Sequence, residues 1–149
     1  MKTHAPLYDQ DFYAWTQQQA VLLRARKWCD LDYDNLAEEL EALGKRDRRE
    51  LERRLEVLVM HLLKWCYQPE RRTRSRSWRS TIREQRRRLA RLLQDSPSLR
   101  SEVPTFLDDG YPHARGKALD ETALPPETLP PTCPWTAAQV LDDAFWPEG

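Results

Sequence analysis

The chain has 149 residues, of which 40% are hydrophobic and 32% charged, with only 4 glycines and a formal net charge of zero. A chain of this length is large enough to bury roughly 70% of the surface of its unfolded state. Six tryptophans supply bulky core side chains, and the composition is typical of amphipathic helices and excludes a disordered chain. We therefore expect a single helical domain over residues 1–149.

Several classes of protein are excluded by what the sequence lacks. No run of about 18 uncharged apolar residues occurs, and the N-terminal residues lack the apolar region of a secretory signal. Cys29, Cys66 and Cys133 form no CxxC pair, so we expect reduced, buried thiols without structural zinc. The four scattered glycines exclude a phosphate-binding loop, and no GxSxG motif is present. These features predict a soluble, cytoplasmic protein.

The first predicted element is a helix with a regular apolar face. Apolar residues recur at steps of four and three over Tyr8–Leu22, with Gln19 as the polar exception. This period predicts a helix from about Asp9 to Arg26. An aspartate-rich loop follows, in which Asp32 or Asp34 is suited to cap the next helix, because its carboxylate can accept a hydrogen bond from a free backbone N–H.

A longer helical pattern occupies Asn35–Trp65, and it has two interpretations. In the first, Gly44 ends one helix, and Asp47 with Glu50 forms the capping box of the next. In the second, one helix of about thirty residues tolerates Gly44 at a cost of about 1 kcal/mol. We favour the single helix because the apolar residues keep one phase across the glycine. Gln68-Pro69 ends it, since proline disfavours a helical residue before it.

The third helix is predicted over roughly Ser77 to Gln94. Ser96-Pro97 then has the form of a helix start, a capping serine followed by proline in the first turn. Pro104 and the Gly110-Tyr111-Pro112 sequence interrupt the segment that follows, so we expect two short helices there.

The last part of the chain is rich in proline. Two Leu-Pro-Pro sequences predict an extended crossing at about 124–134. Thr136-x-x-Gln139 is a capping box that opens a final short helix to about Phe145. The whole pattern predicts an all-α fold, an irregular helical bundle with three main helices and shorter C-terminal helices.

The order of several short sequence blocks resembles one known family. The blocks are Tyr8-Asp9-Gln10-Asp11-Phe12-Tyr13-Ala14-Trp15, Asn35-Leu36-Ala37-Glu38-Glu39-Leu40-Glu41-Ala42-Leu43-Gly44, His61-Leu62-Leu63-Lys64-Trp65, Gln68-Pro69, Ser96-Pro97-Ser98-Leu99-Arg100, Glu121-Thr122 and Cys133-Pro134. Together they are similar to a bacterial, often cyanobacterial, family catalogued as domain of unknown function twenty-nine. The resemblance covers nearly the whole chain. It implies an all-helical fold and no activity, ligand or catalytic residue.

The charge is unevenly distributed, with a net charge of +8 over residues 68–94 and −7 over residues 95–149. A row of arginines lies opposite the apolar side of the third helix: Arg79, Arg83, Arg87 and Arg91 are each four residues apart on one line, and Arg76 falls in the same sector. Like charges four residues apart repel by about 0.2–0.5 kcal/mol per pair, so the row gains from an anionic neighbour. That neighbour is either nucleic-acid phosphate, with Arg71, Arg72 and Arg74 extending the patch, or the acidic C-terminal segment. A third interpretation, which the sequence favours, is a solvated face whose arginines pair with Glu84, Asp95 and that segment.

A metal site is a further hypothesis for the long helix. Glu39 and Glu41, with His61 further along, are the candidate ligands of a carboxylate-bridged metal. Such bundles use Glu-x-x-His with the ligands pointing inward, and that spacing is absent. His61 lies near the apolar stripe, where a histidine held by one buried hydrogen bond is commoner than a ligand.

The sequence thus favours a non-catalytic interaction or regulatory module that binds another macromolecule, most simply a protein, without cofactor, metal or membrane. The alternatives are a nucleic-acid-binding protein that uses the arginine row and a metal-dependent enzyme built on Glu39, Glu41 and His61. A homo-oligomer is compatible with each of these three interpretations.

Overall fold

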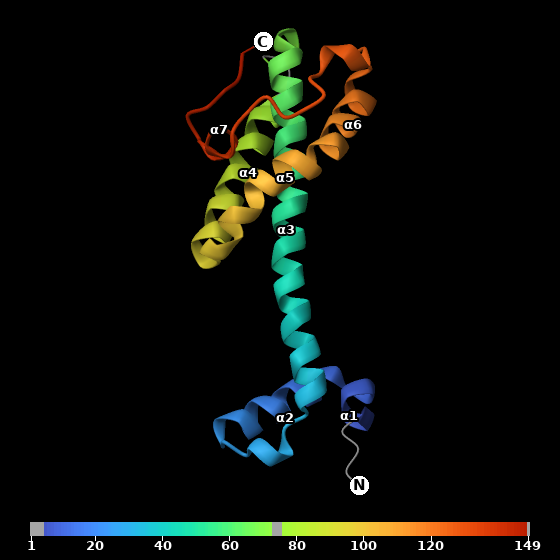
Figure 1. Cartoon of the computed structure of the whole chain (residues 1–149), viewed down its shortest axis with the longest axis vertical. Coiled ribbons are helices and arrows are strands. Elements are labelled where there is room, and N and C mark those ends of the chain that lie inside the picture. The colour runs from blue at the N-terminus through green and yellow to red at the C-terminus, as the bar shows by residue number, and fades with distance from the viewer. Residues whose placement is uncertain (1–4, 73–75, 149) are drawn as a thin grey trace. The chain divides into compact units, whose positions relative to one another are not determined.

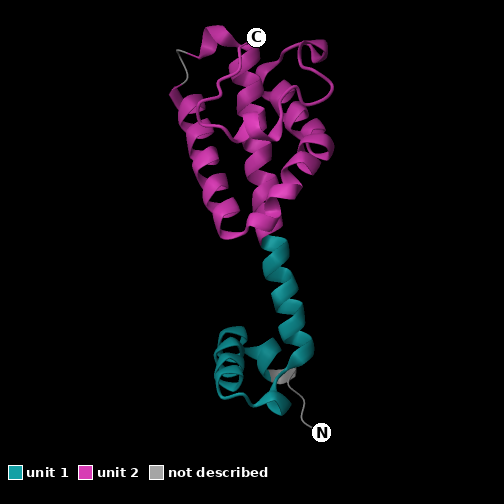
Figure 2. Cartoon of the chain, turned by 60° about the vertical axis from the view of Figure 1, so that its left-hand side comes forward, with its two compact units in different colours: residues 1–46 teal, residues 47–149 magenta. Residues whose placement is uncertain are grey.

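The structure is a computed structural model that describes residues 5–72 and 76–148. Over these residues it contains helices and no strand, which confirms the predicted all-α fold (Figure 1). The chain forms two compact units, residues 1–46 and residues 47–149 (Figure 2). The single domain expected from the sequence stays a prediction. No helix in the described part of the chain combines the length and the apolarity that crossing a bilayer requires.

The N-terminal unit begins with two helices where the sequence predicted one. Helix α1 spans Ala5–Gln10 and α2 spans Phe12–Arg24, so the expected helix from Asp9 to Arg26 is corrected to a pair. The break occurs because Asp11 leaves the helical conformation and its Oδ1 accepts a hydrogen bond from Ala14 N at 2.9 Å. Periodicity did not reveal the break, since the apolar residues keep their phase across it.

A buried polar cluster joins α2 to the turn before the next helix. Asp32 is buried, and its Oδ2 accepts a hydrogen bond from Trp15 Nε1 at 3.0 Å. The Asp32 backbone N–H donates to Gln19 Oε1 at 2.8 Å. Gln19, the polar exception on the apolar face of the first helix, therefore satisfies a buried donor at the turn into the next helix.

Helix α3 spans Tyr33–Tyr67, and it confirms the single-helix interpretation. The boundary between the two units, between Arg46 and Asp47, lies inside it. A Cβ added at Gly44 would meet nothing within 4 Å, so no contact inside the described chain requires the glycine. The helix ends directly before Gln68-Pro69, as the proline predicts.

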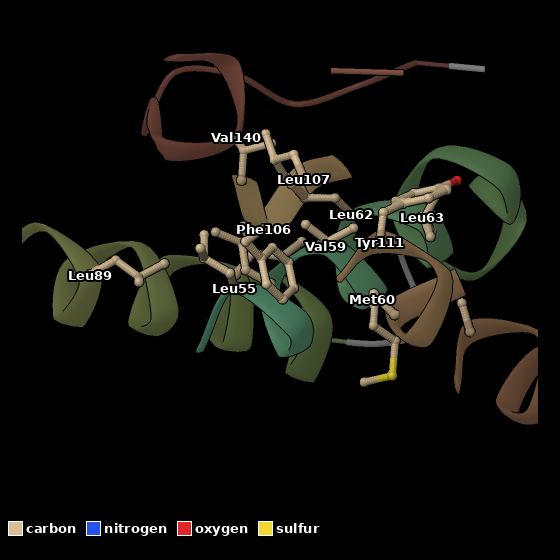
Figure 3. Close-up of a cluster of buried hydrophobic side chains, with 14 of the residues drawn as sticks. Leu55, Val59, Met60, Leu62, Leu63, Leu89, Phe106, Leu107, Tyr111 and Val140 are labelled. Atoms are coloured by element: carbon tan, nitrogen blue, oxygen red, sulfur yellow. The ribbon is translucent and has the colours of Figure 1, made fainter. Parts of the chain in front are cut away.

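The C-terminal unit is built from the rest of α3 and four further helices: α4 (Arg76–Asp95), α5 (Glu102–Asp109), α6 (Tyr111–Thr122) and α7 (Ala137–Leu141). Figure 3 shows side chains from these helices meeting in one buried cluster. Leu55, Val59 and Leu62 of α3 are fully buried in it, together with Leu89 of α4 and Val140 of α7. The apolar face predicted for the long helix is thus the centre of the core.

The boundaries of the shorter helices follow their prolines and glycine. The two short helices predicted after Ser96 are present as α5 and α6, preceded by a 3-10 turn over Pro97–Ser101. The predicted interruption at Pro104 is corrected, because Pro104 lies in the first turn of α5, where its missing N–H leaves no helical hydrogen bond unmade. Pro112 lies in the first turn of α6, where its missing N–H costs nothing.

The C-terminal capping box is confirmed, but the helix that it opens is shorter than predicted. The Thr136 side chain accepts from Gln139 N, and Gln139 Oε1 accepts from the Thr136 backbone N–H. Helix α7 ends at Leu141 instead of about Phe145, since Asp142 adopts an extended backbone conformation. The preceding crossing at about 124–134 contains one 3-10 turn, Pro126–Thr128.

Candidate functional site: an arginine groove on α4

Helix α4 separates two faces sharply. Its inner face buries Trp78, Ile82, Leu89 and Leu93, and the predicted arginine row lies on the outside. The side chains of Arg76, Arg79, Arg83, Arg87 and Arg91 are all exposed. The separation follows from the helical period, which places residues four apart on one line of the surface.

Four members of the row line a single open groove. Its lining residues are Trp65, Arg72, Arg76, Arg79, Ser80, Arg83, Glu84 and Arg87. We call this surface the arginine groove. Arg91 does not belong to it and lies beside Asp95, with Arg91 Nε 3.5 Å from Asp95 Oδ2. Of the three arginines expected to extend the patch, Arg72 lines the groove, Arg71 does not, and Arg74 lies outside the described residues.

Two tryptophans support the groove, and sequence reasoning missed both. The Arg79 guanidinium carbon lies 5.4 Å from the centroid of the Trp65 ring and 5.6 Å from that of Trp146. Arg83 lies 5.8 Å from the centroid of the Trp146 ring. These distances are typical of cation–π interactions, which stabilise a guanidinium group and leave its charge unchanged. No local signal predicts the contact of Trp146, because it is far from α4 in the sequence.

The carboxylate partners of the row lie on α4 itself. Glu84 Oε1 is 2.9 Å from Arg87 Nη2 and 2.5 Å from Arg88 Nε. These hydrogen bonds, from Arg87 first and Arg88 second, lower the pKa of Glu84 to about 2. Among the ion pairs found in residues 5–72 and 76–148, none joins the row to a carboxylate of the segment after Asp95. The acidic C-terminal segment instead contributes Trp146 to the row.

Three arginines of the row that line the groove have no carboxylate partner among the described residues. Within the described part of the chain, no carboxylate oxygen lies within 4.0 Å of the guanidinium groups of Arg76, Arg79 or Arg83. Each guanidinium has a planar fork of N–H donors that matches a carboxylate or phosphate in a bidentate arrangement. The groove can therefore bind an anionic group through at least these three side chains.

Arg86 faces inward from the same helix, and no feature of the sequence predicted its position. Its side chain is 2% exposed, and its Nε donates a hydrogen bond to Val140 O at 2.9 Å. Burial lowers the pKa of Arg86, whereas the nearby Asp143 and Asp142 raise it. Arg86 therefore anchors α7 to α4 and is not available to a ligand.

The predicted metal ligands make other contacts. Glu39 accepts a hydrogen bond from the Tyr8 hydroxyl, Glu41 is exposed, and His61 Nδ1 lies 2.8 Å from Val57 O. Where the structure describes the chain, it brings together no group of three histidine, cysteine, aspartate or glutamate side chains that could hold a metal.

The cysteines differ in exposure, which corrects the expectation of three buried thiols. Cys66 is buried and Cys133 is half-buried, but Cys29 is exposed on the 3-10 turn over Trp28–Asp30. Burial raises the pKa of the Cys66 and Cys133 thiols, so both are protonated and unreactive near neutral pH.

Comparison with known proteins agrees with the resemblance seen in the sequence. The model of the family described as "Domain of unknown function DUF29" matches residues 7–146. No curated protein matches the chain, and no solved structure does.

Proposed function

The chain belongs to the DUF29 family, and we propose that it is a non-catalytic binding module whose arginine groove takes an acidic segment of another protein. One observation carries the proposal: Arg76, Arg79 and Arg83 line one groove, and no carboxylate among the described residues pairs with them. Like charges held this close destabilise one another, so an anionic partner relieves their repulsion. Arg79 and Arg83 are also held in place by the tryptophan rings, which reduces the entropy lost on binding.

The groove is better suited to binding than to catalysis. Its carboxylate, Glu84, has a pKa of about 2 because Arg87 and Arg88 hydrogen-bond to it. A carboxylate so strongly stabilised as an anion is a poor general base or acid near neutral pH. The arginines supply hydrogen-bond donors and positive charge.

Acidic protein is favoured over nucleic acid by the state of the aromatic rings. Single-strand binders present exposed rings on which bases stack. Here Trp65 is only 6% exposed, and Trp146 is flanked by the guanidinium groups of Arg79, Arg83 and Arg86.

Affinity capture from the native cell, with nuclease-treated lysate, tests the proposal. The bait proteins are the wild type, an Arg79→Gln/Arg83→Gln variant and a control with the same net charge, Arg91→Gln/Arg100→Gln. Both control positions are exposed and lie outside the groove. We expect one or more proteins to bind the wild type and the control and to be lost from the groove variant, each with an acidic segment that competes as a synthetic peptide.

Two outcomes contradict the proposal. If no protein distinguishes the groove variant from the control, the groove is not a protein-binding site. If RNA or DNA is recovered from untreated lysate with the wild type and lost with the groove variant, the partner is nucleic acid.

A further inference from the structure

The N-terminal unit exposes an unusual amount of apolar surface. The large hydrophobic side chains that are exposed in the described chain all lie within residues 1–46: Phe12, Tyr13, Val21, Leu23, Trp28, Tyr33, Leu40 and Leu43. Among the side chains of this unit that the structure describes, Trp15 and Leu31 are the buried apolar ones. A unit of this size needs more buried apolar surface than that, and small units of this kind commonly obtain it by association.

Part of this surface forms an apolar groove between α2 and α3, which we call the N-terminal groove. Its lining residues are Phe12, Trp15, Thr16, Gln19, Ala20, Leu23, Leu36, Glu39, Leu40, Leu43 and Arg46. Leu36, Leu40 and Leu43 are spaced four and three residues apart on α3, which is the spacing of a helix–helix seam. Leu40 is 67% exposed and Leu43 is 50% exposed, so none of the described helices covers this part of the seam.

The charges of the N-terminal groove identify what covers it. Its two charged lining residues are Glu39 and Arg46, one on each side of the Leu40–Leu43 pair along α3. Seven residues of helix separate them, a rise of about 10 Å. A second α3 running antiparallel across the first, with Leu40 against the partner's Leu43, brings the partner's Arg46 to within two residues of Glu39, about 3 Å along the helix axis, which a long arginine side chain can span. The same pairing occurs twice, as a two-fold symmetric interface requires. Glu39 Oε1 also accepts the Tyr8 hydroxyl within the unit, and a carboxylate has a second oxygen with which to pair.

We infer that the N-terminal groove is the interface of a homodimer, in which the α2–α3 pairs of two copies form a four-helix arrangement around Leu40 and Leu43. Two-helix units commonly complete a core in this way. The inference concerns a surface other than the arginine groove and does not rest on the proposed function.

Sedimentation equilibrium of the full chain across micromolar concentrations tests the interface. We expect the wild type to sediment as a dimer and a Leu40→Ser/Leu43→Ser variant as a monomer. The control is Val21→Ser, which removes an exposed apolar side chain of α2 that does not line the groove, and it should stay dimeric. A monomeric wild type, or a dimeric Leu40→Ser/Leu43→Ser variant, overturns the inference.

A charge reversal tests the antiparallel arrangement without touching an apolar residue. Arg46→Glu places like charges against Glu39 twice per dimer, so we expect the dissociation constant to rise by about ten-fold or more. Glu39→Gln/Arg46→Glu removes the like-charge contact and keeps an oxygen that accepts the Tyr8 hydroxyl, so it should recover much of that loss. If the double variant dissociates as readily as Arg46→Glu, the copies do not pair through these residues and the inference fails.

Discussion

At the scale of single residues, Arg86 shows the cost of a charge inside a helical core. Its Nη1 and Nη2 are buried without a hydrogen-bond partner among the described residues, although Nε is bonded to Val140 O. A buried cation is often replaceable by an apolar side chain of similar volume, whereas its truncation leaves a cavity. In urea titrations, we expect the free energy of unfolding of Arg86→Met to lie within about 1 kcal/mol of the wild-type value. We expect that of Arg86→Ala to be lower than wild type by about 2–4 kcal/mol. Equal losses in the two variants would mean that the charge itself stabilises the fold.

His61 predicts a dependence of stability on pH. Burial lowers the pKa of its imidazole below the ordinary 6.5, and Lys64 adds to this while Val57 O and Glu121 oppose it. The unfolded chain takes up a proton as the pH falls through 6.5 and the folded chain resists it, so the stability present above that pH is lost below it. The limiting slope for one proton is about 1.4 kcal/mol per pH unit.

Urea titrations between pH 8 and pH 5 measure this effect. We expect His61→Gln to flatten the decline in the free energy of unfolding on the acid side. The matched control is His113→Gln, which removes an exposed imidazole. An unchanged slope in His61→Gln would show that other groups cause the acid sensitivity.

At the scale of elements, the corner between α5 and α6 depends on one glycine for space. A Cβ at Gly110 would overlap the ring of Phe106, whereas a Cβ at Gly116, within α6, would meet nothing within 4 Å. We therefore expect Gly110→Ala to lower the free energy of unfolding by about 1–3 kcal/mol, because Phe106 must move. Gly116→Ala should raise it by about 0.5–1 kcal/mol through helix propensity. Thermal melts of both variants measure these two changes in stability. A Gly110→Ala variant more stable than the wild type would mean that the Phe106 ring moves away without cost.

The elements that local signals specify were predictable, and those that depend on distant contacts were not. The unbroken phase across Gly44 and the capping box at Thr136 each act within a few residues, and both are confirmed. The break at Asp11 depends on a single side-chain bond that periodicity does not register. For the candidate site, helical spacing predicted the arginine row. The docking of Trp146 against it arises from the path of the whole C-terminal segment, which no local pattern encodes.

At the scale of the whole molecule, the two units differ in how much apolar surface they bury. The core cluster lies in residues 47–149, whereas the N-terminal unit buries Trp15 and Leu31 beside a polar cluster. Regions with few buried apolar side chains open at lower free energy. We expect backbone amides of α2 to exchange with deuterium faster than those of α4. The difference should be largest at low protein concentration, where the inferred dimer dissociates. Equal protection in the two helices at every concentration would contradict this expectation.

The charge distribution of the whole chain decides how the arginine groove responds to salt. If the groove bound nucleic acid through phosphates, each neutralised phosphate would add about 0.7–0.9 to the slope of log affinity against log salt. Four engaged arginines would then give a slope of about −3 to −4, and Arg83→Gln/Arg87→Gln would reduce the magnitude of that slope by about 1.5–2.

We expect instead negligible binding of single-stranded or duplex DNA at physiological salt, because the net charge of +8 over residues 68–94 is nearly cancelled by the net charge of −7 over residues 95–149. Fluorescence anisotropy of labelled oligonucleotides over a range of salt concentrations measures this directly. Micromolar binding at physiological salt with that steep slope would make nucleic acid the partner of the groove.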